Sequence, residues 1–262
     1  MPTSALYVAR TGLEAQDARM RVIANNLANV NTTAFKRDRA NFATLAYQDA
    51  RVAGQQSSSE TAYATGLNLG TGVSVQSTTR IETSGPLNST GNSFDLALDG
   101  DGYFQVELPG GQTGYTRAGN FSRSSEGQLV TAQGYAVQPP VTVPEGAISV
   151  AIAPDGTVSA MVSGQSEASE LGQITIASFA NPAGLQAAGD NFLLETGASG
   201  AAQTGVAGEG GRGRIRQGML EGSNVNIVEE LVGMIECQRA YEINSKMISS
   251  VDEMLRNANQ TL

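Results

Sequence analysis

The sequence predicts an α+β protein in which two discontinuous terminal helices, packed as a coiled-coil-like pair, flank a β-rich middle domain. Three observations predict this fold. Apolar residues recur at every seventh position near the start of the chain, and they do so again near its end. Between these stretches, short runs of alternating apolar and polar residues are separated by turn residues. The 262 residues suffice for one large domain or two modest ones.

The first predicted helix runs from Leu6 to Val30. Asparagines cluster at its end, and because Asn is a poor interior residue and a good cap, one of them is expected to end the helix. The others exceed what a cap requires, and amides that donate and accept suit bonds between closely packed helices. The predicted contact residues of this helix are Leu6, Leu13, Met20, Ile23, Asn25, Asn26, Leu27, Asn29 and Val30.

The second predicted helix begins at Ile227, after Asn226 as N-cap and with Glu229 as its capping-box partner. At about 30 residues it would extend roughly 45 Å. Its apolar stripe has the narrow, seven-residue repeat of a packed helix or a coiled-coil seam. The predicted contact residues are Ile227, Leu231, Met234, Ile235, Tyr241, Ile248, Val251 and Leu255.

Two explanations of these stripes are open. Burying seven or eight apolar side chains on one helix yields roughly 10–20 kcal/mol, whereas ordering about 30 residues costs on the order of 30–60 kcal/mol. A lone helix, or a pair of helices with no further partner, is therefore only marginally stable. The helices form either an intrachain antiparallel coiled coil or a packing among copies in neighbouring subunits, and the asparagine cluster favours the second explanation.

The middle of the chain, from about residue 73 to 221, is expected to be β-rich. Pro154, Asp155 and Gly156 stand between two apolar runs and predict a hairpin, because proline presets φ, Asp bonds its own backbone and Gly accepts a positive φ. Residues 108–112 and 125–128 are weaker turn signals of the same kind. The stretch from about 47 to 72 has a polar, low-complexity centre whose composition alone predicts a flexible linker.

The composition argues against an enzyme and against several partners. The chain has no His and a single Cys, so it cannot form a Ser-His-Asp or Cys-His pair or an internal disulfide. Its net charge of −9 disfavours nucleic acid and anionic membranes. The segment around Asp99 and Asp101 fails the calcium-loop pattern, because Phe104 stands where the loop needs Gly. We therefore predict no catalytic, cofactor-binding or metal-binding residue.

Two further features leave options open. A glycine-rich turn at 208–216 could bind an anion through Arg212, Arg214 and Arg216, although a solvated hairpin edge is the commoner structure. No apolar run has the length of a membrane span, and the first residues do not resemble a signal peptide. Taken alone, the latter points to the cytoplasm.

Several motifs carry a family resemblance. The sequence NNLANVNT at 25–32, followed by AFKR at 34–37, resembles the N-terminal signature of the flagellar rod and hook proteins. The closing segment, SNVN at 223–226 and QRAYE at 238–242, resembles the last helix of the same family. In the middle, DGDGYFQV at 99–106 and YTR at 115–117 resemble its β core. The resemblance covers essentially the whole chain.

The resemblance implies a non-enzymatic structural subunit of the flagellar basal body that assembles into a straight, rigid helical tube and transmits torque. It implies that residues 1–35 and 222–262 form the inner-tube domain, and that 73–221 form a β-rich outer domain. Residues 36–72 are expected to be extended and to carry an insert at about 47–64 that resembles one found in the rod branch and is implicated in stiffness. Its predicted residues are Tyr47, Gln55, Ser58 and Tyr63.

The resemblance also implies partners and a location. The expected partners are further copies of the chain, the proximal rod proteins, the hook protein, the outer-ring proteins that act as a bushing, and the flagellar type III export apparatus. Export by that apparatus needs no cleavable signal and would place the chain in the periplasm. The alternatives are a hook or proximal-rod subunit of the same family, or a soluble periplasmic β-rich binding protein with an intrachain helical hairpin.

Overall fold

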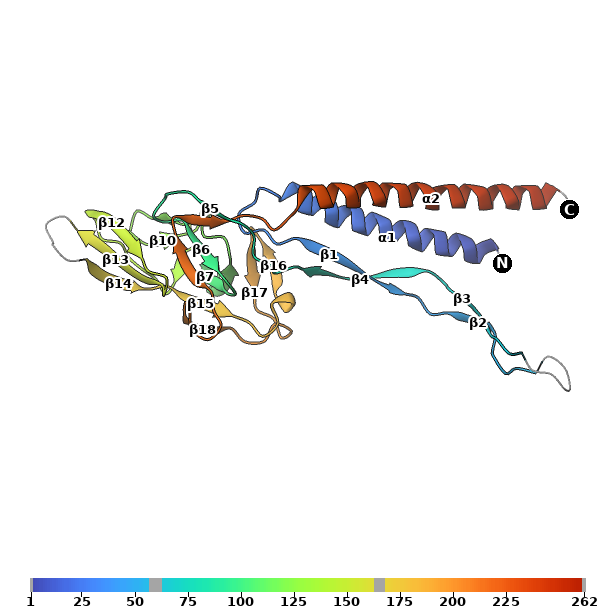
Figure 1. The fold of residues 1–262 in the computed structure, drawn as a ribbon, viewed down its shortest axis with the longest axis horizontal. Helices are drawn as coiled ribbons and strands as arrows, with labels where there is room; N and C mark the ends of the chain where they lie inside the picture. Colours follow the sequence, from blue (N-terminus) through green and yellow to red (C-terminus); the bar gives the residue numbers. More distant parts are fainter. Residues whose placement is uncertain (1, 57–62, 163–167, 261–262) are drawn as a thin grey trace. The chain divides into compact units, whose positions relative to one another are not determined.

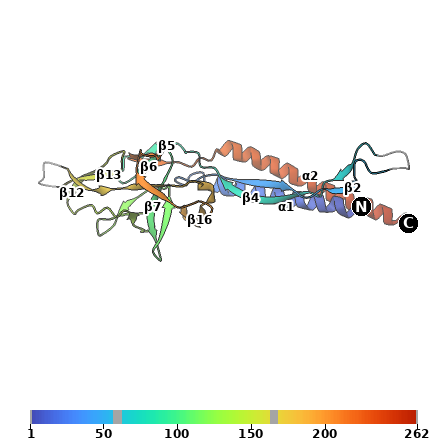
Figure 2. The ribbon, with the colours of Figure 1, turned by 90° about the horizontal axis from the view of Figure 1, so that it is seen from below.

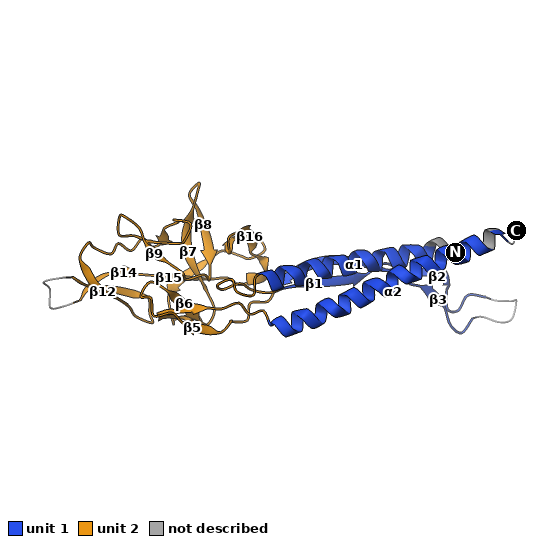
Figure 3. Ribbon diagram, turned by 90° about the horizontal axis from the view of Figure 1, so that it is seen from above, with its two compact units in different colours: residues 1–28, 38–79, 226–262 blue, residues 29–37, 80–225 orange. Residues whose placement is uncertain are grey.

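The computed structural model describes residues 2–56, 63–162 and 168–260, drawn as a ribbon in Figure 1. The chain divides into two compact units, which Figure 3 colours separately. Unit 1 consists of residues 1–28, 38–79 and 226–262, and unit 2 of residues 29–37 and 80–225. The chain therefore passes between the units four times.

Unit 1 contains the two long helices and two β ribbons. The ribbons pair β1 with β4 and β2 with β3. Its elements are α1 (Pro2–Ala28), β1 (Asp38–Thr44), β2 (Gln48–Arg51), β3 (Leu67–Leu69), β4 (Val73–Arg80) and α2 (Ile227–Gln260).

Helix α1 packs against α2 on one side and against β1 on another (Figures 1 and 2). Helix α2 starts as predicted: the Oδ1 atom of Asn226 accepts a hydrogen bond from Val228 N at 3.0 Å, and its amide lies 3.4 Å from the Glu229 carboxylate. Within the described chain, α2 packs on only one other element to any extent, the helix α1.

Unit 2 is built from antiparallel strands. Its largest sheet has the strand order β16-β17-β8-β7-β15-β18, with β11 also paired to β7, and a smaller sheet has the order β12-β13-β14. Three further pairs are β10 with β9, β19 with β6, and β20 with β5. The elements are β5 (Leu87–Ser89), β6 (Leu96–Asp99), β7 (Tyr103–Leu108), β8 (Gln112–Thr116), β9 (Ser122–Arg123), β10 (Leu129–Val130), β11 (Val137–Gln138), β12 (Ala147–Ile152), β13 (Thr157–Val162), β14 (Ser169–Gln173), β15 (Thr175–Ser178), the 3-10 turn η1 (Pro182–Gly184), β16 (Gln186–Gly189), β17 (Phe192–Leu194), β18 (Gln203–Val206), β19 (Arg214–Gln217) and β20 (Met219–Glu221).

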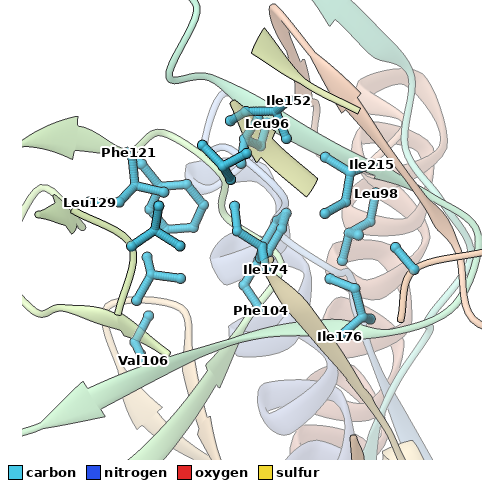
Figure 4. Packing of buried hydrophobic residues seen from close by; sticks show 14 of the residues in the cluster. Leu96, Leu98, Phe104, Val106, Phe121, Leu129, Ile152, Ile174, Ile176 and Ile215 are labelled. Atoms are coloured by element: carbon cyan, nitrogen blue, oxygen red, sulfur yellow. The ribbon is translucent and has the colours of Figure 1, made fainter. Parts of the chain in front are cut away.

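The core of unit 2 lies between these sheets. Figure 4 shows residues from β6, β7, β15 and β19 packed together, with Leu96, Phe104 and Ile176 fully buried. The rings of Phe104 and Phe121 meet edge to face with centroids 5.2 Å apart. This cluster is the part of the chain whose apolar surface is fully covered by its own neighbours.

The predicted α+β fold with two terminal helices around a β-rich middle is confirmed. The predicted hairpin is also confirmed: β12 and β13 pair antiparallel, Gly156 has a φ of 91°, and Asp155 accepts the Thr157 amide. The turns predicted at 108–112 and 125–128 join β7 to β8 and β9 to β10.

Two expectations differ from the structure. The first helix spans Pro2–Ala28 rather than Leu6 to Val30, because the chain turns at residue 29, where the Asn29 carbonyl accepts the Thr32 amide. The composition of 47–72 predicts a flexible linker, whereas β2 and β3 pair there with the register Gln48↔Leu69. Local backbone pairing supplies the order that apolar burial does not.

The core packing predicts that Phe104→Ala destabilises unit 2 by about 3–5 kcal/mol, since the large ring leaves a cavity in a fully packed site. Chemical denaturation followed by the tyrosine near-UV signal measures this, because the chain has no Trp and Tyr103 and Tyr115 are buried in unit 2. Ile148→Ala, at a position 70% exposed, is the control. A Phe104→Ala loss as small as that of the control would contradict the packing.

Candidate assembly site on the terminal helices

The seam between α1 and α2 is antiparallel and closely packed. The Cys237 thiol is fully buried and donates to the Gln16 carbonyl at 3.0 Å. A Cβ atom at Gly12 would lie 3.1 Å from the Asn244 side-chain nitrogen, so glycine permits the approach of the two helices here. The seam therefore uses small and polar residues as well as apolar ones, and burial raises the pKa of the Cys237 thiol.

A second, neighbouring side of α1 contacts the β1–β4 ribbon. The Asn26 side chain, 1% exposed, exchanges two hydrogen bonds of 2.9 Å with the backbone of Asp38 at the start of β1. The Thr11 hydroxyl accepts from the Val73 amide at 3.3 Å. Helix α1 is thus covered from two directions within its own chain.

Helix α2 differs, because it presents a long apolar surface to solvent. At 100° per residue, positions 228, 231, 232 and 235 lie on the side of the helix opposite positions 230, 237 and 244, and position 227 lies on the flank between the two sides. Positions 230 and 237 are buried, and 244 faces α1. We call residues 227, 228, 231, 232 and 235 the outer row. The exposed large apolar residues of α2 are Ile227, Val228, Leu231, Val232, Ile235, Tyr241, Ile243, Met247 and Met254, and their exposure runs from 44 to 68%.

The predicted contact residues therefore separate into two sets in unit 1 and a pair in unit 2. Those turned toward the chain's own elements are buried or half-buried: Leu6, Leu13, Met20, Ile23, Asn26, Leu27, Met234, Ile248, Val251 and Leu255. The exposed ones are Asn25, Ile227, Leu231, Ile235 and Tyr241. Asn29 and Val30 are half-buried and belong to unit 2. The role of all these residues in contacts between subunits stays a prediction.

The seven-residue pattern merged two stripes of α2. The residues between the repeats, Val228 and Val232, belong to the outer row but were not predicted as contacts. A helical projection over the first three turns would have found them, since a helix apolar on two opposite sides is covered on both.

The predicted insert, at about 47–64, contains β2 and the described residues that follow it, and β3 comes after it in the chain. Tyr47 is 60% exposed just before β2. Beyond the strands, the backbone of Tyr63 pairs with Gly54 and Gln55 at 2.8 and 2.9 Å, and the Arg51 guanidinium lies 4.1 Å from the centre of the Tyr63 ring. Ser58 lies outside the described residues. All residues of β2 and β3 are exposed, so the hairpin buries little within its own chain.

A groove of about 780 Å³ lies in unit 1 along this hairpin. Tyr7 and Val8 of α1, Leu69 of β3 and Met247 of α2 contribute exposed apolar surface to it. The hairpin, α1 and Met247 of α2 therefore line one groove with exposed apolar surface within unit 1.

A buried ion cluster in unit 2 was not predicted. The Glu221 carboxylate, with its side chain fully buried, accepts from the Lys36 ammonium at 2.6 Å and from the Arg117 Nε at 2.9 Å. It also accepts from the Gly85 amide at 2.9 Å, while Arg117 donates to the carbonyls of Gly100 and Gly102. Lys36 and Arg117 stand in motifs that carried the family resemblance, but spacing could not pair residues so far apart.

The charges in this cluster act on one another in both directions: burial and the Arg117 charge lower the pKa of Lys36, and the bond to Glu221 opposes that shift. Burial alone would raise the pKa of Glu221, but the Arg117 charge and the bond from Lys36 outweigh it and lower that pKa. Nearby, burial and the Glu82 carboxylate raise the pKa of Tyr103, whose hydroxyl donates to Glu82 at 3.0 Å. We therefore assign Glu221 as ionised and Tyr103 as neutral at pH 7.

The sequence left open an anion site at the glycine-rich turn, residues 208–216. Arg212 donates to the carbonyls of Gln203, Thr204 and Glu209, and Arg216 pairs with Asp99 at 2.8 Å, so two of the three arginines of the glycine-rich turn are engaged within the chain. Among residues 2–56, 63–162 and 168–260, no group of Cys, Asp or Glu side chains could hold a metal ion. No helix in the described part of the chain has the length and hydropathy to cross a bilayer.

Comparison with known proteins gives consistent likenesses. Three family models match: a flagella basal body rod protein model at residues 6–36, a flagellar hook protein FlgE/F/G D1 domain model at 97–160, and a flagellar basal body rod FlgEFG protein C-terminal model at 216–261. The chain is 48% identical to the flagellar basal-body rod protein FlgG of Buchnera aphidicola (subsp. Acyrthosiphon pisum), across 97% of this chain and 98% of that protein. It is 47% identical to FlgG of Caulobacter vibrioides, across 98% of both chains. It is 38% identical to FlgG of Bacillus subtilis, across 96% of both.

The cluster predicts that Glu221→Gln lowers the free energy of unfolding of unit 2 by about 3–5 kcal/mol at pH 7, since two buried cations lose their counter-charge. Because the folded pKa of Glu221 lies below its usual value of 4.5, its contribution is present above that pH and is lost as the pH falls through the folded pKa. Denaturation from pH 7 to pH 3 should show a steeper acid loss for wild type than for Glu221→Gln.

The matched control is Asp99→Asn, which breaks the exposed pair with Arg216 and should have little effect. Parallel acid curves for wild type and Glu221→Gln would show that Glu221 does not carry the charge assigned to it.

Proposed function

Because this chain belongs to the flagellar basal-body rod protein family, we propose that it is a structural subunit of the distal rod. Copies assemble into a straight, rigid helical tube that transmits torque from the motor to the hook. The observation that carries this proposal is the outer row of α2, an apolar surface on the side opposite its only extensive partner in the described chain.

The energetics favour coverage of that row by a second copy. Fully burying a large apolar side chain is worth roughly 1.5–3 kcal/mol, and each outer-row residue is about half exposed, so five of them supply on the order of 4–7 kcal/mol. A contact between unlike surfaces of identical copies does not close on itself when its rotation leaves a gap, and it then extends as a helical filament. In that filament, residues 1–35 and 222–262 form the inner tube and residues 73–221 the outer domain.

The β2–β3 hairpin is the proposed stiffening element. Its strands are exposed and its flanking groove is apolar, so it is suited to contact a neighbouring copy rather than its own chain. A contact of this kind at some distance from the helices resists bending, because it fixes neighbouring subunits at a second point. Tyr47, Gln55, Ser58 and Tyr63 are the residues that we assign to it.

The remaining partners follow from the family. We propose contacts with proximal rod proteins at one end of the tube, with the hook protein at the other, and with outer-ring proteins that act as a bushing. Export would use the flagellar type III apparatus without a cleavable signal, and the assembled chain would lie in the periplasmic part of the basal body. A structural role of this kind requires no catalysis.

The alternatives gain no specific support. A periplasmic binding protein with a helical hairpin needs an apolar seam but has no use for an apolar row on the opposite side of α2. A hook or proximal-rod subunit is disfavoured because the identities of 38–48% over nearly the full length are to basal-body rod proteins named FlgG.

We predict that Val232→Asp prevents polymerisation and leaves the monomer folded, because Val232 is 51% exposed and faces away from α1. Sedimentation and electron microscopy of the purified chain measure assembly, and circular dichroism measures folding. Ser250→Asp introduces the same charge at another exposed position of α2 and should still polymerise. Filaments of normal yield from Val232→Asp would refute the outer row as an interface.

We predict that a chain without the hairpin assembles into curved filaments. Residues 47–70 are replaced by an Asn-Gly turn, which the structure permits because Ala46 O and Thr71 Oγ1 lie 2.6 Å apart. Curvature is measured on electron micrographs against the wild-type chain and against Ile148→Ala, a change at an exposed position outside the hairpin. Straight filaments from the hairpin-less chain would assign the hairpin a different role.

A further inference from the structure

Three of the four passages of the chain between the units adjoin segments of unit 2 that bond one another around the ion cluster. The passages lie at residues 28/29, 37/38, 79/80 and 225/226. Three segments of unit 2 adjoin the last three passages: residues 34–37, 81–85 and 221–224. Each of these segments donates to or accepts from the other two.

Segments 34–37 and 221–224 are joined by backbone and side-chain bonds. The Ala34 amide donates to the Glu221 carbonyl at 2.8 Å, and the Arg37 amide donates to the Asn224 side chain at 2.7 Å. The Lys36 ammonium, 2.6 Å from the Glu221 carboxylate, adds an ion pair with no solvent access. These two segments lead to β1 and to α2.

Segment 81–85 is bound to both of the others. The Ile81 amide donates to the Arg37 carbonyl at 2.9 Å, and Lys36 donates to the Thr83 carbonyl at 2.8 Å. The Gly85 amide donates to Glu221, and the Asn224 amide donates to the carbonyls of Ile81 and Thr83. The remaining passage, at 28/29, leads to a segment that is bonded elsewhere in unit 2: the Asn191 side chain donates to the Thr33 carbonyl at 3.0 Å.

The Glu221 carboxylate is the point at which these bonds meet the sheet. It contacts Lys36 of the first segment, Gly85 of the second and, through Arg117, the backbone of residues 100 and 102. We call Lys36, Arg117 and Glu221 the clamp.

Stability alone does not account for the clamp. Apolar residues of the same volume often stabilise a protein as well as, or better than, a buried ion pair. Apolar contacts, however, are non-directional, so packed segments can slide past one another at little cost. Charge-assisted hydrogen bonds fix both direction and distance, and sliding breaks them.

We propose that the clamp is a torsional coupling: it locks the three segments together so that a twisting load entering through α1, α2 and the β1–β4 ribbon is shared among the connections. This rests on the proposed function as a torque-carrying rod subunit. Lys36, Arg117 and Glu221 are positioning residues in this device, and they contact no partner themselves because they are buried.

The test separates load from stability. The full-length chain replaces the resident copy in flagellated cells, as wild type, as Asp99→Asn, and as the apolar triple variant Lys36→Met, Arg117→Met, Glu221→Leu. Rotation is followed with small beads on flagellar stubs, a low load, and with tethered cells, a high load. The triple variant should rotate small beads at the wild-type speed and fail in tethered cells several-fold more often, and Asp99→Asn should match wild type at both loads.

If the triple variant does not fold, a second pair of variants tests whether the clamp acts as a torsional coupling. Lys36→Arg keeps the charge and should behave as wild type at high load, whereas Lys36→Met should fail there. Wild-type rotation of tethered cells by the folded triple variant, or equal behaviour of Lys36→Arg and Lys36→Met, would overturn the coupling and leave the rod function intact. If the wild-type chain itself forms no rods, the proposed function fails instead.

Discussion

Helix α2 carries apolar surface on two opposite sides, and α1 covers only one of them. That constraint organises unit 1. The side facing α1 uses small residues and buried Cys237 for close approach, whereas the outer row remains about half exposed. A monomer gains nothing from such a row, and water contact with it favours association. The same reasoning applies to the exposed β2–β3 hairpin, and we propose that other copies of the chain cover both surfaces of unit 1.

Unit 2 differs from unit 1 in that its apolar core is covered within the chain. Its core is closed, with Leu96, Phe104 and Ile176 out of contact with solvent, and the buried cations Lys36 and Arg117 are both paired with Glu221. The clamp joins residues 36, 117 and 221, which are far apart in sequence. One unit thus has a closed core and bonds three of its connecting segments to one another, while we propose that the other provides surfaces for assembly.

Much of this could be predicted from the sequence. Periodicity identified both helices, and Pro154-Asp155-Gly156 identified a hairpin, because these signals are local. The two-sidedness of α2 was hidden, since a seven-residue repeat selects one position per two turns and passed over Val228 and Val232. Asn26 was expected to bond between helices but bonds the backbone of Asp38, a choice that depends on where β1 lies. The clamp could not be predicted for the same reason: no regular spacing in the sequence indicates which distant charged residues pair in the fold.

In the assembly that we propose, a neighbouring copy covers the outer row of α2. Hydroxyl-radical footprinting of the purified chain, as monomer and as filament, measures this directly. We predict that Val228, Val232 and Ile235 are modified in the monomer and protected in the filament, while Ile148, exposed on β12, serves as a reference for overall access. Equal modification of the outer row in both states, with filaments present, would contradict it.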